Sequence, residues 1–239
     1  MRALSSSEML QLWERGCGLH PLDQALLALA AASPGASLDS LADLPLGERN
    51  RALVRLHSDC FGSQIGGWVP CPACGEKLEF ELDGAMLLSG SAATTNSVTI
   101  DGQSFRLPSS RDLALAAREI EPTHAALALV ARCSLDPAAA TRGWSPAQIE
   151  VIGEQMALAD PLAEPRLSFA CALCGHAWDE LLDLAGFFWT EMEVQVRRVL
   201  REVHALARAY GWSETEILTL SEARRALYLD LVRAEMVRA

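Results

Sequence analysis

Hydrophobic positions recur with helical spacing near both ends of the chain. Apolar residues three and four positions apart form the face of a helix that packs on a core. Stretches with this pattern occupy residues 9–13, 22–32, 48–60, 196–210 and 217–232. A capping box of Ser5 with Glu8 precedes the first stretch and marks the start of a helix. The pattern therefore predicts a helical N-terminal region, residues 1–64, and a helical C-terminal region, residues 185–239.

The middle of the chain changes to the alternating pattern of β-strands. Leu78, Phe80 and Leu82 alternate with charged residues, which is typical of a strand with one exposed face. A second stretch with strand-like composition comes much later in the chain. We therefore expect two short β units, residues 65–83 and residues 166–184.

The residues between the two β units, 84–165, form a predicted insertion. Asp101-Gly102 separates two apolar runs and favours a hairpin at 98–107 with a type I′ turn. Helical patterns follow at 112–120, 123–133 and 146–159. The insertion is thus expected to contain one hairpin and several helices.

Composition and charge narrow the class of protein. The chain has 239 residues, half of them apolar, which is enough to bury a sizeable core. Its net charge is −11, and the first 190 residues hold the whole acidic excess. Binding to nucleic acid or to an anionic membrane surface needs a basic face, so neither is expected. We also expect no membrane span and no secretory signal, because no apolar run is long enough.

Four of the seven cysteines form two Cys-x-x-Cys-Gly motifs. Cys71 and Cys74 belong to the first motif, and Cys171 and Cys174 to the second. The two-residue spacer lets both thiolates reach one ion, and the glycine permits a positive φ that turns the backbone toward the sulfurs. Four thiolates make a closed tetrahedral site, which is structural and not catalytic. These residues are the candidate ligands of a structural Zn²⁺.

The long separation of the two motifs does not argue against a shared ion. Ninety-six residues lie between Cys74 and Cys171, whereas a compact zinc ribbon has ~15–20. The extra loop-closure entropy is ~1.6 kcal/mol. A structural zinc contributes ~10–16 kcal/mol, so binding easily offsets that cost.

Other roles for these cysteines stay open from the sequence. Iron held by four thiolates has the same spacing, and a redox dithiol uses the same motif but places it where a strand enters a helix. His176 follows the second motif, and we interpret it as a surface residue or one that supports a ligand. The remaining cysteines are interpreted as small buried side chains: Cys17, Cys60 and Cys133.

No further motif indicates catalysis. The sequence contains no nucleophile elbow, phosphate loop or His-Glu-x-x-His, and its other histidines lie apart. We therefore expect a protein that is not an enzyme and has no small-molecule substrate. The aromatic run 187–189 is a candidate either for a partner contact or for burial between two structural layers. Arg224-Arg225 either lie on a solvated face or contact an acidic partner.

These patterns together predict a mainly α-helical fold with a small β zinc ribbon. The ribbon is split, because its halves come from segments far apart in sequence. In this interpretation it joins the helical N- and C-terminal regions, and the insertion hangs from it.

The C-terminal region also resembles a known family. The stretch 201–221 (REVHALARAYGWSETEILTLS), followed by Arg224-Arg225 and Tyr228-Leu229, resembles phage-type baseplate proteins of contractile tails and contractile injection systems. The same resemblance extends to Trp13-Glu14-Arg15-Gly16, Phe61-Gly62, residues 71–79, and Phe188-Trp189 with Glu191. It is weakest over residues 84–165. The family is similar to the baseplate-hub assembly proteins of T-even-like phages.

The resemblance implies a non-enzymatic baseplate component or hub assembly factor. Its expected partners are other baseplate, hub or spike proteins, and its expected location is the cytoplasm of the producing bacterium, with incorporation into the particle left open. Zinc versus iron, the partners' identity and the role of the insertion also stay open at this point. The alternative is a zinc-ribbon adaptor in nucleic-acid processing or transcription. The acidic net charge disfavours this alternative, because it disfavours direct contact with nucleic acid.

Overall fold

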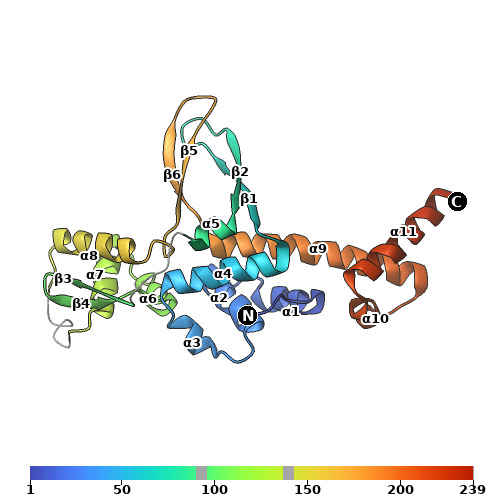
Figure 1. Cartoon of the computed structure of the whole chain (residues 1–239), viewed down its shortest axis with the longest axis horizontal. Coiled ribbons are helices and arrows are strands. Elements are labelled where there is room, and N and C mark those ends of the chain that lie inside the picture. The colour runs from blue at the N-terminus through green and yellow to red at the C-terminus, as the bar shows by residue number, and fades with distance from the viewer. Residues whose placement is uncertain (90–95, 137–142, 239) are drawn as a thin grey trace.

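The computed structural model describes residues 1–89, 96–136 and 143–238. Its helices form an elongated body, and two β-hairpins project from that body side by side (Figure 1). The helices are α1 (Ser6–Gly16), α2 (Pro21–Ala32), α3 (Leu38–Ala42), α4 (Leu46–Phe61), α5 (Gly84–Ser89), α6 (Ser110–Ala116), α7 (Pro122–Cys133), α8 (Pro146–Ala159), α9 (Leu184–Tyr210), α10 (Glu214–Thr219) and α11 (Glu222–Arg238). The strands are β1 (Gln64–Pro70), β2 (Lys77–Asp83), β3 (Ser97–Ile100), β4 (Gln103–Arg106), β5 (Arg166–Ala170) and β6 (Ala177–Leu181). The mainly helical class with small antiparallel sheets is confirmed.

The long helix α9 is the spine of the main core. Helices α1, α2 and α4 pack against it, and the side chains of Leu29, Leu56, Met192 and Leu206 are completely buried there. The N- and C-terminal regions therefore join by direct packing, a link that the sequence did not predict and that is separate from the cysteine segments. The reason is that α9 presents a continuous apolar stripe, long enough for helices from the first sixty residues to cover it.

Local capping chemistry places the helix ends. The predicted capping box of Ser5 with Glu8 begins α1, and equivalent boxes begin α8 at Ser145 and α10 at Ser213. Gly211 ends α9 with a φ of +70°, a left-handed conformation that glycine adopts without a penalty. The short helices α3 and α5 had no periodic pattern from which to be predicted.

The insertion has a small core of its own. Its hairpin, β3 with β4, turns at Asp101 and Gly102, whose φ angles of +49° and +76° are those that a type I′ turn requires. Helices α7 and α8 cover this hairpin. The buried side chains between them are those of Phe105, Val130, Cys133, Trp144, Ile152 and Met156.

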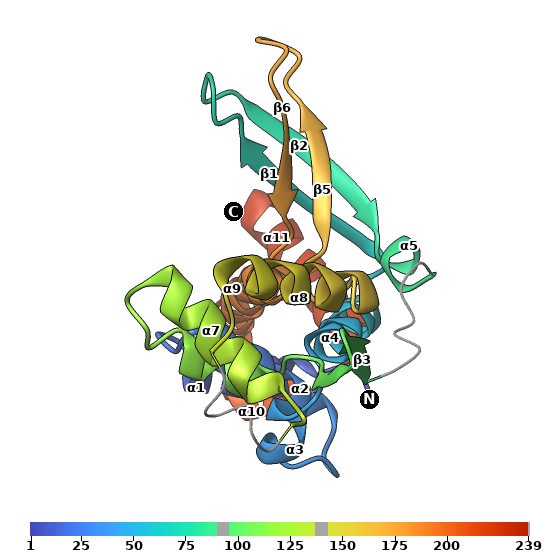
Figure 2. The same cartoon turned by 90° about the vertical axis from the view of Figure 1, so that its left-hand side faces the viewer.

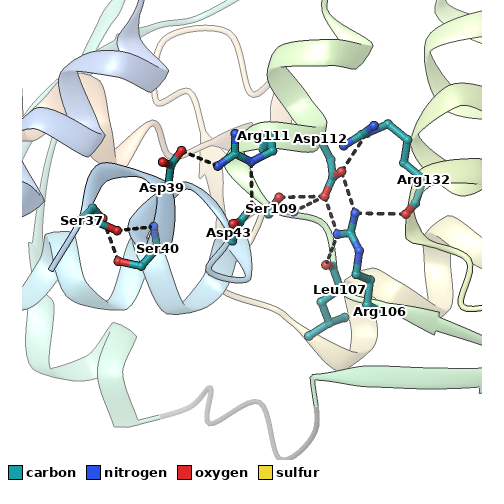
Figure 3. Close-up of polar contacts among 10 residues, drawn as sticks. All are labelled: Ser37, Asp39, Ser40, Asp43, Arg106, Leu107, Ser109, Arg111, Asp112 and Arg132. Atoms are coloured by element: carbon teal, nitrogen blue, oxygen red, sulfur yellow. Dashed lines mark hydrogen bonds and ion pairs between the residues drawn. The ribbon is translucent and has the colours of Figure 1, made fainter.

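Salt bridges attach the insertion to the N-terminal helices (Figure 3). Arg111 on α6 bridges Asp43 at 2.8 Å and Asp39 at 2.9 Å, at the end of α3 and within it. One residue further, the carboxylate of Asp112 is completely buried between Arg106 at 2.8 Å and Arg132 at 2.9 Å. The exposed and buried bridges therefore sit side by side at the same junction.

A second attachment forms at the start of α4. This helix has no side-chain cap of its own at Pro45, and the buried Asp160 from the end of α8 supplies one. The Asp160 Oδ2 atom accepts a hydrogen bond of 2.8 Å from the Gly47 N–H. Only glycine fits at position 47, because a Cβ atom there would lie 1.6 Å from Asp160 Oδ1.

We predict that Gly47→Ala destabilises the protein by about 2 kcal/mol, since it forces the Asp160 carboxylate away from the helix start. Gly153→Ala is the matched control, because that exposed glycine of α8 has no atom within 4 Å of an added Cβ. Helix propensity alone makes the control variant more stable, by ~0.5–1 kcal/mol. Urea denaturation of both variants measures the difference, and a stabilised Gly47→Ala variant would contradict the prediction.

Candidate metal centre

The two projecting hairpins carry the two cysteine motifs at their tips. Strands β1 and β2 pair in antiparallel register from Gln64↔Asp83 to Pro70↔Lys77, and β5 and β6 pair from Arg166↔Leu181 to Ala170↔Ala177. Each Cys-x-x-Cys-Gly motif forms the turn of its hairpin. Figures 1 and 2 show both tips on the same side of the molecule, away from the helical body.

The two turns have the same hydrogen bonds. In each, the first cysteine donates its N–H to the carbonyl of the residue five positions later, at 2.8 Å. Its own carbonyl accepts a hydrogen bond of 2.8 Å from the glycine that follows the second cysteine. These glycines, Gly75 and Gly175, have φ angles of +77° and +74°, as predicted from the motif. The two turns are thus repeats of one local structure.

The turns bring the four predicted thiols into one cluster. The sulfur atoms of Cys71, Cys74, Cys171 and Cys174 all lie within 4.8 Å of one another. Cys71 Sγ is 3.7 Å from Cys174 Sγ, and Cys74 Sγ is 3.6 Å from Cys171 Sγ. These separations exceed the ~2.05 Å of a disulfide. They approach the ~3.8 Å edge of a tetrahedron whose metal–sulfur bonds are ~2.3 Å. The cluster is compatible with a metal site.

The electrostatic surroundings of the thiols explain why this cluster suits a cation. The backbone N–H of Cys174 donates to the Cys171 thiol and lowers its pKa to about 7. The pKa of Cys74 is raised to about 12: the Glu76 N–H lowers it, but burial and the three neighbouring thiols favour the neutral form. Four thiolates repel one another, so the cluster is fully ionised only around a positive ion.

A ladder of aromatic rings runs from the second turn to the helical body. His176 stacks on Trp178 with ring centroids 5.8 Å apart, and Trp178 stacks on Phe169 at 5.5 Å. Phe169 contacts Phe80 of the other hairpin at 5.7 Å, and Phe80 contacts Phe187 of α9 at 5.6 Å. His176 is therefore an exposed stacking residue beside the cluster and not a member of it.

The aromatic run 187–189 packs in two layers. Phe188 and Trp189 lie in the main core, whereas Phe187 faces the hairpins. Successive helix residues differ in direction by ~100°, so one run serves both sides of α9. Packing, one of the two interpretations made from the sequence, accounts for these three residues.

Several other candidate residues have structural roles. Arg225 is buried and bridges Glu202 at 3.0 Å, with a further hydrogen bond of 3.0 Å to Ser6 Oγ, so it holds α11 and α1 to α9. Its neighbour Arg224 is exposed, so the solvated-face interpretation of this pair fits Arg224 and is wrong for Arg225, whose guanidinium is taken up by Glu202 and Ser6. Burial lowers the pKa of His57, whose Nδ1 atom lies 3.2 Å from the Gly62 carbonyl oxygen.

The cysteines outside the motifs do not join the cluster. Cys133 is buried, as predicted, and Cys60 is half-buried. The prediction was wrong for Cys17, which is exposed, because it follows the end of α1 and none of the described elements covers it.

No protein-family model, curated protein or solved structure matches this chain. Among the described residues, no helix is both long enough and apolar enough to cross a membrane.

Proposed function

We propose that this protein is a non-enzymatic baseplate component or baseplate assembly factor of a phage-like contractile injection system, with a structural Zn²⁺ in the cysteine cluster. The observation that carries the structural part is the geometry of the cluster. Two repeated turns, far apart in sequence, bring four thiols within 4.8 Å at the tip of a projecting pair of hairpins. A closed four-thiolate site crosslinks the chain and leaves no open position for a substrate.

Zinc is the metal that the donor set fits best. Cys71, Cys74, Cys171 and Cys174 would hold it, and the ion supplies the positive charge that lets all four thiols ionise. The chain's own contribution is to position the sulfurs through the two turns. In this role the hairpins become one rigid arm, which the aromatic ladder continues into α9.

The baseplate assignment is supported by the family resemblance, and several of the residues that carry this resemblance make contacts within the helical body. Gly16 packs under the ring of Trp189, and Phe61 contacts Phe188 with ring centroids 5.5 Å apart. At the other end of α9, Tyr210, Trp212 and Tyr228 form one ring cluster. A protein with the same residues at these positions is expected to have the same helical body.

The proposal predicts that this chain accompanies contractile particles. Particles and assembly intermediates are purified from the producing bacterium and imaged, and mass spectrometry measures the stoichiometry of this chain in each. We expect a fixed stoichiometry in the particle or in an intermediate. Absence from both would contradict the baseplate role.

A salt-titrated binding assay with the purified chain tests the alternative, a zinc-ribbon adaptor in nucleic-acid processing or transcription. That role predicts DNA or RNA binding that weakens steeply with salt. The exposed carboxylates of Glu79 and Glu81 on the first hairpin, and of Asp179 and Glu180 on the second, disfavour it.

A further inference from the structure

The first hairpin leaves one edge of β1 without a partner strand. Within the described residues, β1 pairs only with β2. Two hydrogen bonds at the ends of this pairing fix its alternation: the Cys71 N–H donates to the Glu76 carbonyl, and the Gly84 N–H donates to the Ser63 carbonyl. In an antiparallel pair every second residue directs both backbone groups to its neighbour. The odd-numbered residues of β1 therefore face β2.

The even-numbered residues direct their backbone groups away from β2. Gly66 and Trp68 thus each present an N–H and a C=O at the free edge, and in the described part of the chain no other backbone group bonds to them. Pro70 stands at the next outward position, where the missing N–H costs no ladder hydrogen bond. The backbone groups of Gly66 and Trp68 form a template for a further strand.

A hollow of about 490 Å³ lies along this edge. One wall is Gly66, Gly67 and Trp68, and the other is the first turns of α9, with Asp183, Gly186, Phe187, Thr190 and Glu191. Successive residues of a strand point to opposite faces. Because three consecutive residues of β1 line the hollow, it lies at the edge of the strand as well as on one face.

The structure requires glycine at only one of the two glycine positions of β1. Gly67 is required by packing, since a Cβ there would lie 2.5 Å from Phe187. Gly66 has no positive φ, and a Cβ there would meet only the Phe80 carbonyl oxygen, at 3.9 Å. A glycine inside a strand often marks close approach by another backbone. Nothing within the described structure requires Gly66, so its position suits an incoming chain.

The charge around the hollow selects the partner. Asp183 and Glu191 are acidic, and no basic residue lines the hollow itself, although the Lys77 ammonium lies over the outer ring of Trp68, 4.3 Å from its centroid. Within the described residues the Glu191 carboxylate has no hydrogen bond or ion pair, and Glu79 and Glu81 add charge on the exposed face of β2. Free edges are commonly protected by charged residues on the strand itself, but β1 has none.

We propose that the free edge of β1 binds an extended segment of a partner protein that bears arginine or lysine. The segment adds as a strand, bonds to the outward N–H and C=O groups of Gly66 and Trp68, and places a cation near Glu191. Asp183 adds negative charge nearby, but its carboxylate already caps α9 by accepting from the Gly186 N–H. This inference rests on the proposed function, whose partners are other particle proteins, and names the kind of segment they supply.

The test uses the 239-residue chain loaded with Zn²⁺ and synthetic peptides. The probes are capped nonapeptides of alternating threonine and valine, one set with arginine at central positions and a matched set with glutamate. Binding is measured by fluorescence anisotropy, and amide exchange of Gly66 and Trp68 is followed by NMR. We expect the arginine set alone to bind and to slow exchange at these two amides.

Different variants test the backbone hydrogen bonds at the edge of β1 and the negative charge beside it. Gly66→Pro removes an outward N–H and is expected to abolish binding, whereas Gly66→Ala keeps the N–H and is expected to bind. Glu191→Gln is expected to weaken binding about tenfold, while Glu150→Gln, an exposed residue of α8, leaves it unchanged. Absence of binding, equal binding of the glutamate peptides, or full binding by folded Gly66→Pro would overturn the inference.

The outcomes distinguish this inference from the baseplate role. If the wild-type chain accompanies particles and folded Gly66→Pro does so equally, the edge is not the docking site although the role stands. If the arginine peptides bind at the edge but the chain is absent from every particle and intermediate, the docking site stands and the baseplate role does not.

Discussion

Removal of the metal ion proposed for the cysteine cluster is expected to unfold both hairpins and to leave most of the helical body folded. An isolated two-stranded hairpin is marginally stable in water, and a structural zinc supplies ~10–16 kcal/mol. The helices α1, α2 and α4 pack on α9 without the hairpins. Hydrogen exchange before and after treatment with a strong chelator should therefore show loss of protection in β1, β2, β5 and β6. The melting temperature should also fall.

Cysteine variants test the same prediction without a chelator. The double variant Cys74→Ser and Cys174→Ser removes one ligand from each turn, and Cys17→Ser is the control because that exposed thiol lies outside the cluster. We expect the double variant to lose bound metal, measured by elemental analysis, and hairpin protection. Equal hairpin protection in the metal-free and metal-loaded proteins would show that no ion stabilises the arm.

The parts of this fold that were predictable are those set by residues close in sequence. A capping box needs only Ser5 and Glu8, and the type I′ turn needs only Asp101 and Gly102, so each could be predicted from a few consecutive residues. The cysteine motifs are equally local. The prediction that the two turns share one site came from the coordination number of a tetrahedral ion, which needs four ligands. No sequence pattern in the residues between the two motifs indicated it.

The unpredicted parts depend on contacts between distant segments. Nothing near Gly16 indicates that it packs under Trp189, and Arg225 gives no sign that its guanidinium lies buried beside Glu202 and Ser6. The direction of the hairpins is a similar case. Strand pattern predicts which face is apolar, but the aromatic contacts of Phe80 with Phe169 and Phe187 decide which neighbour that face meets.

The variant Asp112→Asn is expected to lower the free energy of unfolding by about 3 kcal/mol. Its carboxylate is completely buried between Arg106 and Arg132, and it also accepts hydrogen bonds from Ser109 at the start of α6. An amide turns one acceptor into a donor that faces guanidinium groups. Removing one partner of a buried pair costs ~3–5 kcal/mol, and the lower end applies because both arginines are partly solvated.

The control is Asp39→Asn, which makes the same change at a carboxylate of the same junction (Figure 3). The Asp39 side chain is 88% exposed in its bridge to Arg111, so water replaces the lost charge and stability should hardly change. Urea denaturation at neutral pH compares the two variants. Similar losses in both would contradict the distinction between buried and exposed bridges.

The pH dependence of stability gives an independent measure of the Asp112 contribution. Burial alone would raise the pKa of this carboxyl, but the hydrogen bonds from Arg106 and Ser109 hold it well below its usual range. A group whose folded pKa is lowered stabilises the protein above its unfolded pKa of ~3.9, and this contribution is lost as the pH falls below that value. The wild-type protein should therefore lose its advantage over Asp112→Asn on acidification below about pH 4. An advantage over Asp112→Asn that stayed constant as acid unfolding began would mean that packing, and not the ionised carboxylate, accounts for the effect.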